Sequence, residues 1–446
     1  MSTESAAPPL DALRLLAGAL VLLTFAATAS PARAGPTTLP ATSPTSATSP
    51  IPAAASMAGK VFVGYQGWFA PAVEGTKAKW VHYGNGNKFE PGTSAVEMWP
   101  DTTGFDPDEL VPTAFRHADG RVANVFDSAN PKTIARHFGW MRDHGIDGAF
   151  VQRFGVTAKN PPFRDRMDAV LAGVRAAAAA AGRSYAVMYD LSGMKQDEVN
   201  AVLRPDWRRL VDELRVTADP TYLRHRGKPV VAVWGVGFND GRKYDLAACA
   251  DLVRYLKKEG AAGGGGGVSV MLGVPYWWRG LHRDAVADPA LLSLLAEADV
   301  ISPWAVGRYG TPEEAARRGT EVVKPDLAWA KEHHVDYLPV AFPGFGWSNL
   351  QKLRKQPPGK GIDRLGGRFF WSQAVAAKRA GADMLYVAMF DEIDEGTAIL
   401  PVTNDPPVGA TTFKTYDGLP GDHYLWLAGE AGKVMRGQRP AEPAMP

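Results

Sequence analysis

The sequence predicts an α/β fold, a (β/α)₈ TIM barrel with long loops after its strands. Strand-like runs alternate with helical patterns eight times along the chain. Most of the runs are continuously apolar, which is typical of parallel strands covered on both faces. The eight runs are residues 60–69, 145–154, 184–193, 228–238, 268–278, 298–307, 336–347 and 382–393.

The helical patterns between the runs carry start and stop signals. In residues 131–144, Asn130 can cap the N-terminus, Pro131 suits the first turn, and Gly145 follows the end. A doubly wound open sheet is the alternative, but no GxGxxG motif follows the first strand. The other helical patterns are residues 163–181, 196–217, 244–259, 289–298, 312–334, 367–379 and 422–436.

The predicted barrel domain, residues 58–440, follows a targeting segment and a linker. An apolar run at residues 15–27 precedes a small-residue cleavage pattern that ends at Ala34, so residues 1–34 predict a signal peptide. The run is shorter than the ~20 residues that span a bilayer, and we expect no stable membrane span after cleavage, with a retained anchor as the alternative. Residues 35–57 are rich in Pro, Ser and Thr and predict a disordered linker. We expect a secreted, periplasmic or cell-surface protein.

The composition excludes several classes of protein. The 49 Lys and Arg residues nearly balance the 47 Asp and Glu residues and form no basic stripe, so nucleic acid is not an expected partner. The one cysteine, Cys249, excludes an intramolecular disulfide and a multi-cysteine metal centre. No nucleophile elbow, HExxH motif or P-loop is present in the sequence. We expect a monomer with no cofactor and no catalytic metal.

The predicted carboxyl ends of the strands, where active sites of such barrels lie, are rich in aromatic and polar side chains. Aromatic rings stack on the C–H faces of sugars while polar groups bind the hydroxyls, so this combination predicts a carbohydrate site. Any one of the aromatic residues alone is more often part of a core. The predicted substrate-binding residues are Tyr65, Gln66, Trp68, Gln152, Arg153, Tyr189, Asp190, Trp234, Tyr276, Trp277, Trp304, Trp347, Asp391 and Asp394.

The sequence FDEIDEGTAI, residues 390–399, supplies the candidate catalytic groups, and we call it the acidic segment. It places Asp391, Glu392, Asp394 and Glu395 directly after the last apolar strand. Clustered carboxylates raise one another's pKa, so one can stay protonated as an acid beside an ionised base. Cleavage of a glycosidic bond needs such a pair. A solvated loop, a helix N-terminus and a divalent-cation site are the alternatives.

Residues 70–130 form a long stretch after the first strand and are expected on the same face of the barrel. This stretch carries Trp80, His82, Trp99 and Asp101, and we expect it to wall the cleft.

Three motifs resemble glycoside hydrolase families 99 and 71, which include secreted bacterial proteins labelled xylosidase/arabinosidase and endo-α-mannosidases. They are GYQGWF at residues 64–69, HFGWMRDHGIDGAFVQRF at residues 137–154, and the acidic segment. The resemblance implies a barrel with a Glu-x-x-Glu-Gly motif after its last strand, here Glu392, Glu395 and Gly396. It extends from about residue 61 to about residue 418.

In family 99 the resemblance implies retention through an epoxide. Glu392 would act as a base on the sugar 2-hydroxyl, and Glu395 would protonate the leaving oxygen and later activate water. This chain departs from the family pattern at Asp391 and at Ile393-Asp394, where Asn and Trp-His are usual.

We therefore expect a secreted glycoside hydrolase that cleaves an α-linked polysaccharide or glycan internally, with Glu392 and Glu395 as its catalytic carboxylates. One alternative is a conventional two-carboxylate glycosidase that pairs Asp190 with Glu392. The other is a carbohydrate-binding barrel without catalysis.

Overall fold

The computed structural model describes residues 56–72, 78–264, 266–357 and 359–446. The predicted signal peptide and all but the last two residues of the predicted linker lie outside these residues. Within the described part, no helix combines the length and the apolar character that a membrane crossing requires.

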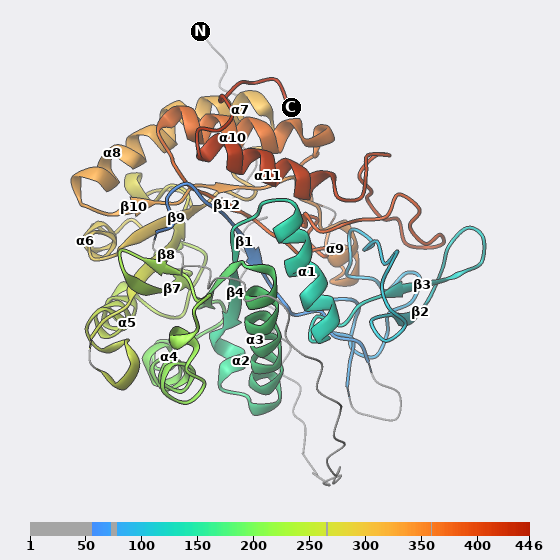
Figure 1. The fold of residues 1–446 in the computed structure, drawn as a ribbon, viewed down its shortest axis with the longest axis horizontal. Coiled ribbons are helices and arrows are strands. Elements are labelled where there is room, and N and C mark those ends of the chain that lie inside the picture. Colours follow the sequence, from blue (N-terminus) through green and yellow to red (C-terminus); the bar gives the residue numbers. More distant parts are fainter. Residues whose placement is uncertain (1–55, 73–77, 265, 358) are drawn as a thin grey trace, which may run out of the picture.

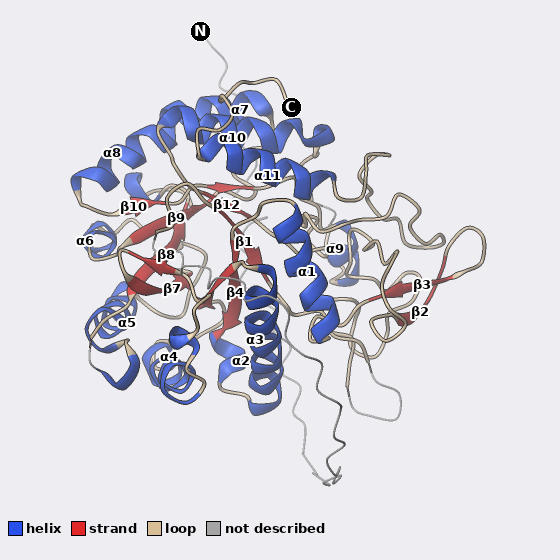
Figure 2. Ribbon diagram, in the orientation of Figure 1, coloured by secondary structure: helices blue, strands red, loops and turns tan. Residues whose placement is uncertain are grey.

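A parallel β-sheet curls around the centre of the molecule, and helices cover its outer face (Figures 1 and 2). Each strand-like run of the sequence contains a strand of this sheet, and the seventh run contains two. The strands are β1 (Val61–Tyr65), β4 (Gly148–Phe154), β5 (Ser184–Asp190), β7 (Lys228–Trp234), β8 (Ser269–Pro275), β9 (Val300–Trp304), β10 (Asp336–Tyr337), β11 (Val340–Ala341) and β12 (Leu385–Val387). A short strand, β6 (Arg224–His225), pairs antiparallel with β7.

The seventh run closes the barrel. Strand β10 pairs with β9, and β11 pairs with β12. Between them, the N–H of Leu338 donates to the carbonyl of Ile301, and the carbonyl of Pro339 accepts from the N–H of Tyr386, each at 2.9 Å. The chain therefore bonds to both neighbours throughout, and Pro339, which lacks an N–H, divides it into two short strands. The predicted (β/α)₈ barrel is confirmed.

The helices follow the strands as the sequence predicts. Asn130 caps α1 by accepting a hydrogen bond from the N–H of Lys132. The main helices are α1 (Pro131–Asp143), α3 (Pro161–Ala181), α4 (Glu198–Arg208), α5 (Leu246–Glu259), α6 (Ala290–Ala296), α7 (Pro312–Arg318), α8 (Lys324–Glu332), α10 (Arg368–Ala380) and α11 (His423–Met435). Shorter elements are α2 (Gly155–Ala158), α9 (Ser348–Leu353), π-helical turns at Arg209–Glu213 and Gly319–Val323, and 3₁₀ turns at Val216–Ala218, Ala262–Gly264, Trp278–Gly280 and Leu365–Gly367.

The stretch after β1 contains an antiparallel hairpin, β2 (Val111–Arg116) and β3 (Val122–Val125), that the sequence does not predict. Trp99 lies in the core beneath it, with its ring 5.0 Å from that of Phe115 and its indole N–H donating to the carbonyl of Asn124 at 3.0 Å. Trp99 is therefore part of the core under the hairpin.

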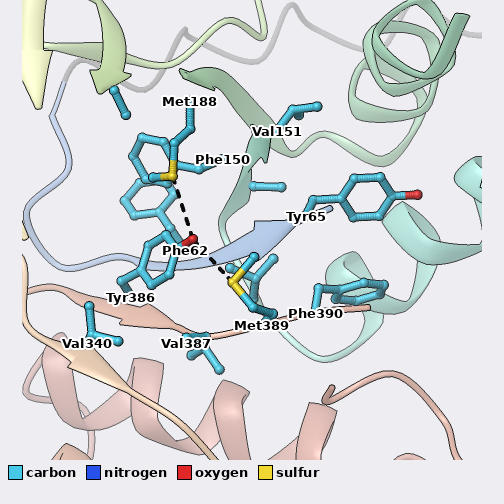
Figure 3. Packing of buried hydrophobic residues seen from close by; sticks show 14 of the residues in the cluster. Phe62, Tyr65, Phe150, Val151, Met188, Val340, Tyr386, Val387, Met389 and Phe390 are labelled. Atoms are coloured by element: carbon cyan, nitrogen blue, oxygen red, sulfur yellow. Dashed lines mark hydrogen bonds between the residues drawn. The ribbon is translucent and has the colours of Figure 1, made fainter. Parts of the chain in front are cut away.

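Alternate strand residues face the barrel interior. Phe62, Phe150, Met188 and Tyr386 meet there from four different strands (Figure 3). The hydroxyl of Tyr386 lies 4.0 Å from the sulfur of Met188 and 3.6 Å from that of Met389. Paired residues of a parallel sheet point to the same face, so this orientation extends along each strand to its carboxyl end.

Candidate active site

The carboxyl ends of β1 and β12 hold the acidic segment against Gln66 and Gly67. The backbone N–H groups of Gln66 and Gly67 donate to the two carboxylate oxygens of Asp391, at 2.7 and 2.8 Å. The side-chain amide of Gln66 donates to Oε1 of Glu392 at 2.8 Å. Three hydrogen bonds therefore fix the acidic segment to the loop after β1.

Asp391 is fully buried. Burial raises its pKa to about 7, although the two backbone N–H groups favour the ionised form and oppose the rise. Because both of its oxygens accept backbone hydrogen bonds, Asp391 anchors the loop, and we no longer expect it to contact substrate.

Glu392 is buried, and both of its carboxylate oxygens accept hydrogen bonds. Gln66 donates to Oε1, and the hydroxyl of Thr397 donates to Oε2 at 2.5 Å. Burial and then the charges of Glu395 and Asp394 raise the pKa of Glu392 well above its usual value, while the two donors oppose the rise. Glu392 is thus held in one orientation beside other carboxylates.

Glu395 is mostly buried at the same end of the barrel. Burial and then the charge of Asp394 raise its pKa to about 8, and Arg354 opposes the rise. Its carbonyl accepts from the N–H of Gly346 at 2.9 Å. Gly396, with φ of +63°, permits this approach, because a Cβ there would lie 3.0 Å from the Gly346 nitrogen. The raised pKa allows Glu395 to keep a proton at neutral pH.

Asp394 lies between Glu392 and Glu395 in the sequence and contacts His82. The Nδ1 atom of His82 is 2.9 Å from Oδ2 of Asp394, while Oδ1 is buried and has no hydrogen-bond partner among the described residues. His82 stacks on Trp68 with ring centroids 3.7 Å apart, and Phe154 stacks on Trp68 at 5.6 Å. His82 therefore occupies one face of the Trp68 indole, so a sugar cannot stack on that face.

Interior-facing residues complete the mouth of the barrel. Gln152 pairs with Met188, which faces the interior, and Asp190, two residues beyond Met188, pairs with Trp234. Gln152, Asp190 and Trp234 therefore also face the interior. Asp190 accepts from the N–H of Ser192 at 2.6 Å. Burial raises the pKa of Asp190, and the charge of Arg242 opposes the rise.

Two indoles meet edge to face on the opposite side of this mouth from the acidic segment. The rings of Trp234 and Trp304 are 5.5 Å apart, and the guanidinium of Arg242 lies 5.1 Å from the ring centroid of Trp234. Nε1 of Trp234 and Oε1 of Gln152 are buried without a partner in the described part of the chain. Such atoms can bind the hydroxyl groups of a ligand.

Three predicted substrate-binding residues face the helices instead, which corrects the sequence-based assignment. Arg153 donates to Asp206 of α4 at 2.6 and 2.7 Å, and the hydroxyl of Tyr189 donates to the same carboxylate at 2.7 Å. The hydroxyl of Tyr65 lies 2.9 Å from Nδ1 of His137 in α1. Each is adjacent in sequence to an interior-facing residue, and successive strand residues point to opposite faces.

The remaining predicted aromatic residues divide into two groups. Trp347 adjoins Gly346, whose N–H binds the Glu395 carbonyl, so it lies beside the acidic segment. Tyr276 packs against Trp277, which lies 4.9 Å from the guanidinium of Arg318 at the end of α7. Tyr276 and Trp277 therefore pack toward the helix layer.

The structure excludes two of the alternatives for the acidic segment. Asp391, Glu392 and Asp394 are buried, which excludes a solvated loop, and the segment is a turn rather than the start of a helix. Nowhere in the described ranges are three or more His, Cys, Asp or Glu side chains grouped to hold a metal ion.

The fold and the site together define a (β/α)₈ barrel with buried, interacting carboxylates at its mouth. Two solved structures of a GH99 endo-α-mannosidase from Bacteroides thetaiotaomicron have similar folds. Each has a TM-score of 0.59, with 16% and 17% identity, and they cover 87% and 86% of this chain and 100% and 99% of their own. A "glycoside hydrolase-like protein" has a TM-score of 0.56 at 15% identity, over 86% of this chain and 96% of its own.

No family model matches this sequence, and no curated protein matches it. At identities this low, the three structures establish a shared fold.

Proposed function

We propose that this chain is a glycoside hydrolase that cleaves an α-linked polysaccharide or glycan internally and with retention. The observation that carries this proposal is the interacting pair Glu392 and Glu395 at the mouth of the barrel. The fold shared with endo-α-mannosidases and the Glu-x-x-Glu-Gly motif support it. The unpartnered polar atoms of Gln152, Trp234 and Asp394 are suited to binding sugar hydroxyls.

The surroundings of the two glutamates favour different roles. Glu392 accepts hydrogen bonds from Gln66 and Thr397, and these favour its ionised form as a base. Glu395 lacks such side-chain donors within the described structure, and the neighbouring Asp394 charge favours its protonated form. Because the two glutamates interact, the protons belong to the pair, and the donors to Glu392 bias the remaining proton toward Glu395.

These roles fit the reaction that the family resemblance implies. Glu392 takes the proton of the sugar 2-hydroxyl while O2 attacks the anomeric carbon and an epoxide forms. The bond to the leaving oxygen breaks, and Glu395 gives that oxygen its proton. Glu395 then takes a proton from water, whose oxygen opens the epoxide at the anomeric carbon, and Glu392 returns the proton to O2. Two displacements at one carbon give retention.

We also propose that the protein is exported, on the basis of the apolar run and the cleavage pattern near its N-terminus.

A product assay tests the proposed function. The exported protein is incubated with α-mannans, α-1,3-glucan, arabinoxylan and arabinan, and the products are analysed by mass. New oligosaccharides from one polymer, absent with the Glu395→Gln variant, support the proposal. Binding of a polymer without any product favours the non-catalytic carbohydrate-binding barrel.

A further inference from the structure

A histidine from the long stretch after β1 reaches the acidic segment. The imidazole of His82 is parallel to the indole of Trp68, with 5° between the planes and 3.7 Å between the centroids. Its Nδ1 atom lies 2.9 Å from Oδ2 of Asp394. Phe154 supports Trp68 from strand β4, so one hydrogen bond and a stack of three rings fix the imidazole.

The backbone of His82 has an uncommon conformation that its neighbours impose. Its φ is +62°, a left-handed value that histidine adopts less readily than glycine. On one side Val81 exchanges backbone hydrogen bonds with Ala70, at 2.9 and 3.2 Å, and on the other the carbonyl of Tyr83 accepts from Ala95 at 2.8 Å. Backbone strain that the surroundings maintain is common at functional sites.

The contact between His82 and Asp394 bears directly on the two glutamates. Asp394 is 3% exposed, and its charge raises the pKa of both Glu392 and Glu395. The position of this carboxylate therefore affects how readily each glutamate takes up a proton.

We propose that His82 is a positioning residue for the catalytic pair: it holds the Asp394 carboxylate in place, and Trp68 holds His82. This inference rests on the proposed function. Because His82 acts through Asp394, removal of His82 matters only while Asp394 is present.

A double-mutant cycle tests this dependence. In the exported protein, His82→Ala lowers kcat about tenfold, but in the Asp394→Asn background the same change alters kcat by less than about twofold. His82→Gln, which keeps a side-chain N–H, recovers part of the loss. His117→Ala is the matched control, because His117 lies 3.5 Å from Asp405 at the hairpin and does not touch the acidic segment. Equal losses in both backgrounds, or no loss in His82→Ala, would overturn the inference.

A second measurement needs no substrate. A histidine stacked on an indole changes the fluorescence emission of that indole. For each protein, the contribution of Trp68 to the emission is obtained by subtracting the spectrum of the same protein carrying Trp68→Phe. His82→Ala should change this contribution, whereas His117→Ala should not. If His82→Ala leaves it unchanged, Trp68 does not hold His82 and the inference is wrong. If the wild type cleaves no polymer, the proposed function fails while the emission still decides the positioning.

Discussion

Arg153 is expected to stabilise the fold without binding substrate, and Arg153→Met tests this. Its side chain is 3% exposed and donates to Asp206 at 2.6 and 2.7 Å and to Asp168 at 3.0 Å. Methionine fills much of the same space but leaves Asp206, which is 5% exposed, without its main partner. Breaking one side of such a buried ion pair costs about 3–5 kcal/mol of the free energy of unfolding.

The assay compares Arg153→Met with Gln152→Ala, its neighbour on the opposite face of β4. Urea unfolding measures stability, and kcat and KM are measured on the polymer that the wild type cleaves. Gln152→Ala should cost only about 1–2 kcal/mol of stability and raise KM, because its amide faces the mouth of the barrel. A raised KM for Arg153→Met with an unfolding midpoint at the wild-type value would show instead that Arg153 binds substrate.

Four further predictions concern the mouth of the barrel. Gln66→Ala removes a donor to the Glu392 carboxylate and should lower kcat about tenfold or more in steady-state assays, with little change in unfolding temperature. Activity should fall as pH rises through about 8, because Glu395 loses its proton there, and a profile that stays flat to pH 9.5 would contradict its acid role. The free energy of unfolding should also rise as pH falls from about 8 toward the usual Glu pKa near 4.5. The reason is that Glu395 binds its proton more tightly in the folded protein than in the unfolded chain. The Glu395→Gln variant should lack this gain when unfolding is measured against pH. Asp190→Asn should reduce kcat less than Glu392→Gln does, and equal losses would favour the conventional pair of Asp190 and Glu392.

The barrel could be predicted from the sequence because its strands are buried on both faces and appear as continuous apolar runs. The same property hides which residues face inward. Gln152 and Arg153 are both polar residues in a buried strand, and no alternation between polar and apolar residues separates them. Strict period-two counting from Phe150, an interior residue, would have selected Gln152 and rejected Arg153.

Two other features depend on contacts that leave no local signal. The hairpin of β2 and β3 is short, and most of the side chains of β2 are exposed or partly exposed, so its residues resemble a loop. His82 and Asp394 are 312 positions apart, and their contact arises only when the first and last strands pair in the closed barrel. By contrast, the acidic segment was predicted because its four carboxylates are neighbours in sequence and follow an apolar strand.

The most direct test of the central claim is the product assay with wild type and Glu395→Gln side by side, together with polymer binding by both. We expect oligosaccharides from one α-linked polymer with the wild type, no product with the variant, and similar binding by the two. Unchanged turnover by Glu395→Gln would contradict the acid role of Glu395 and the mechanism built on it.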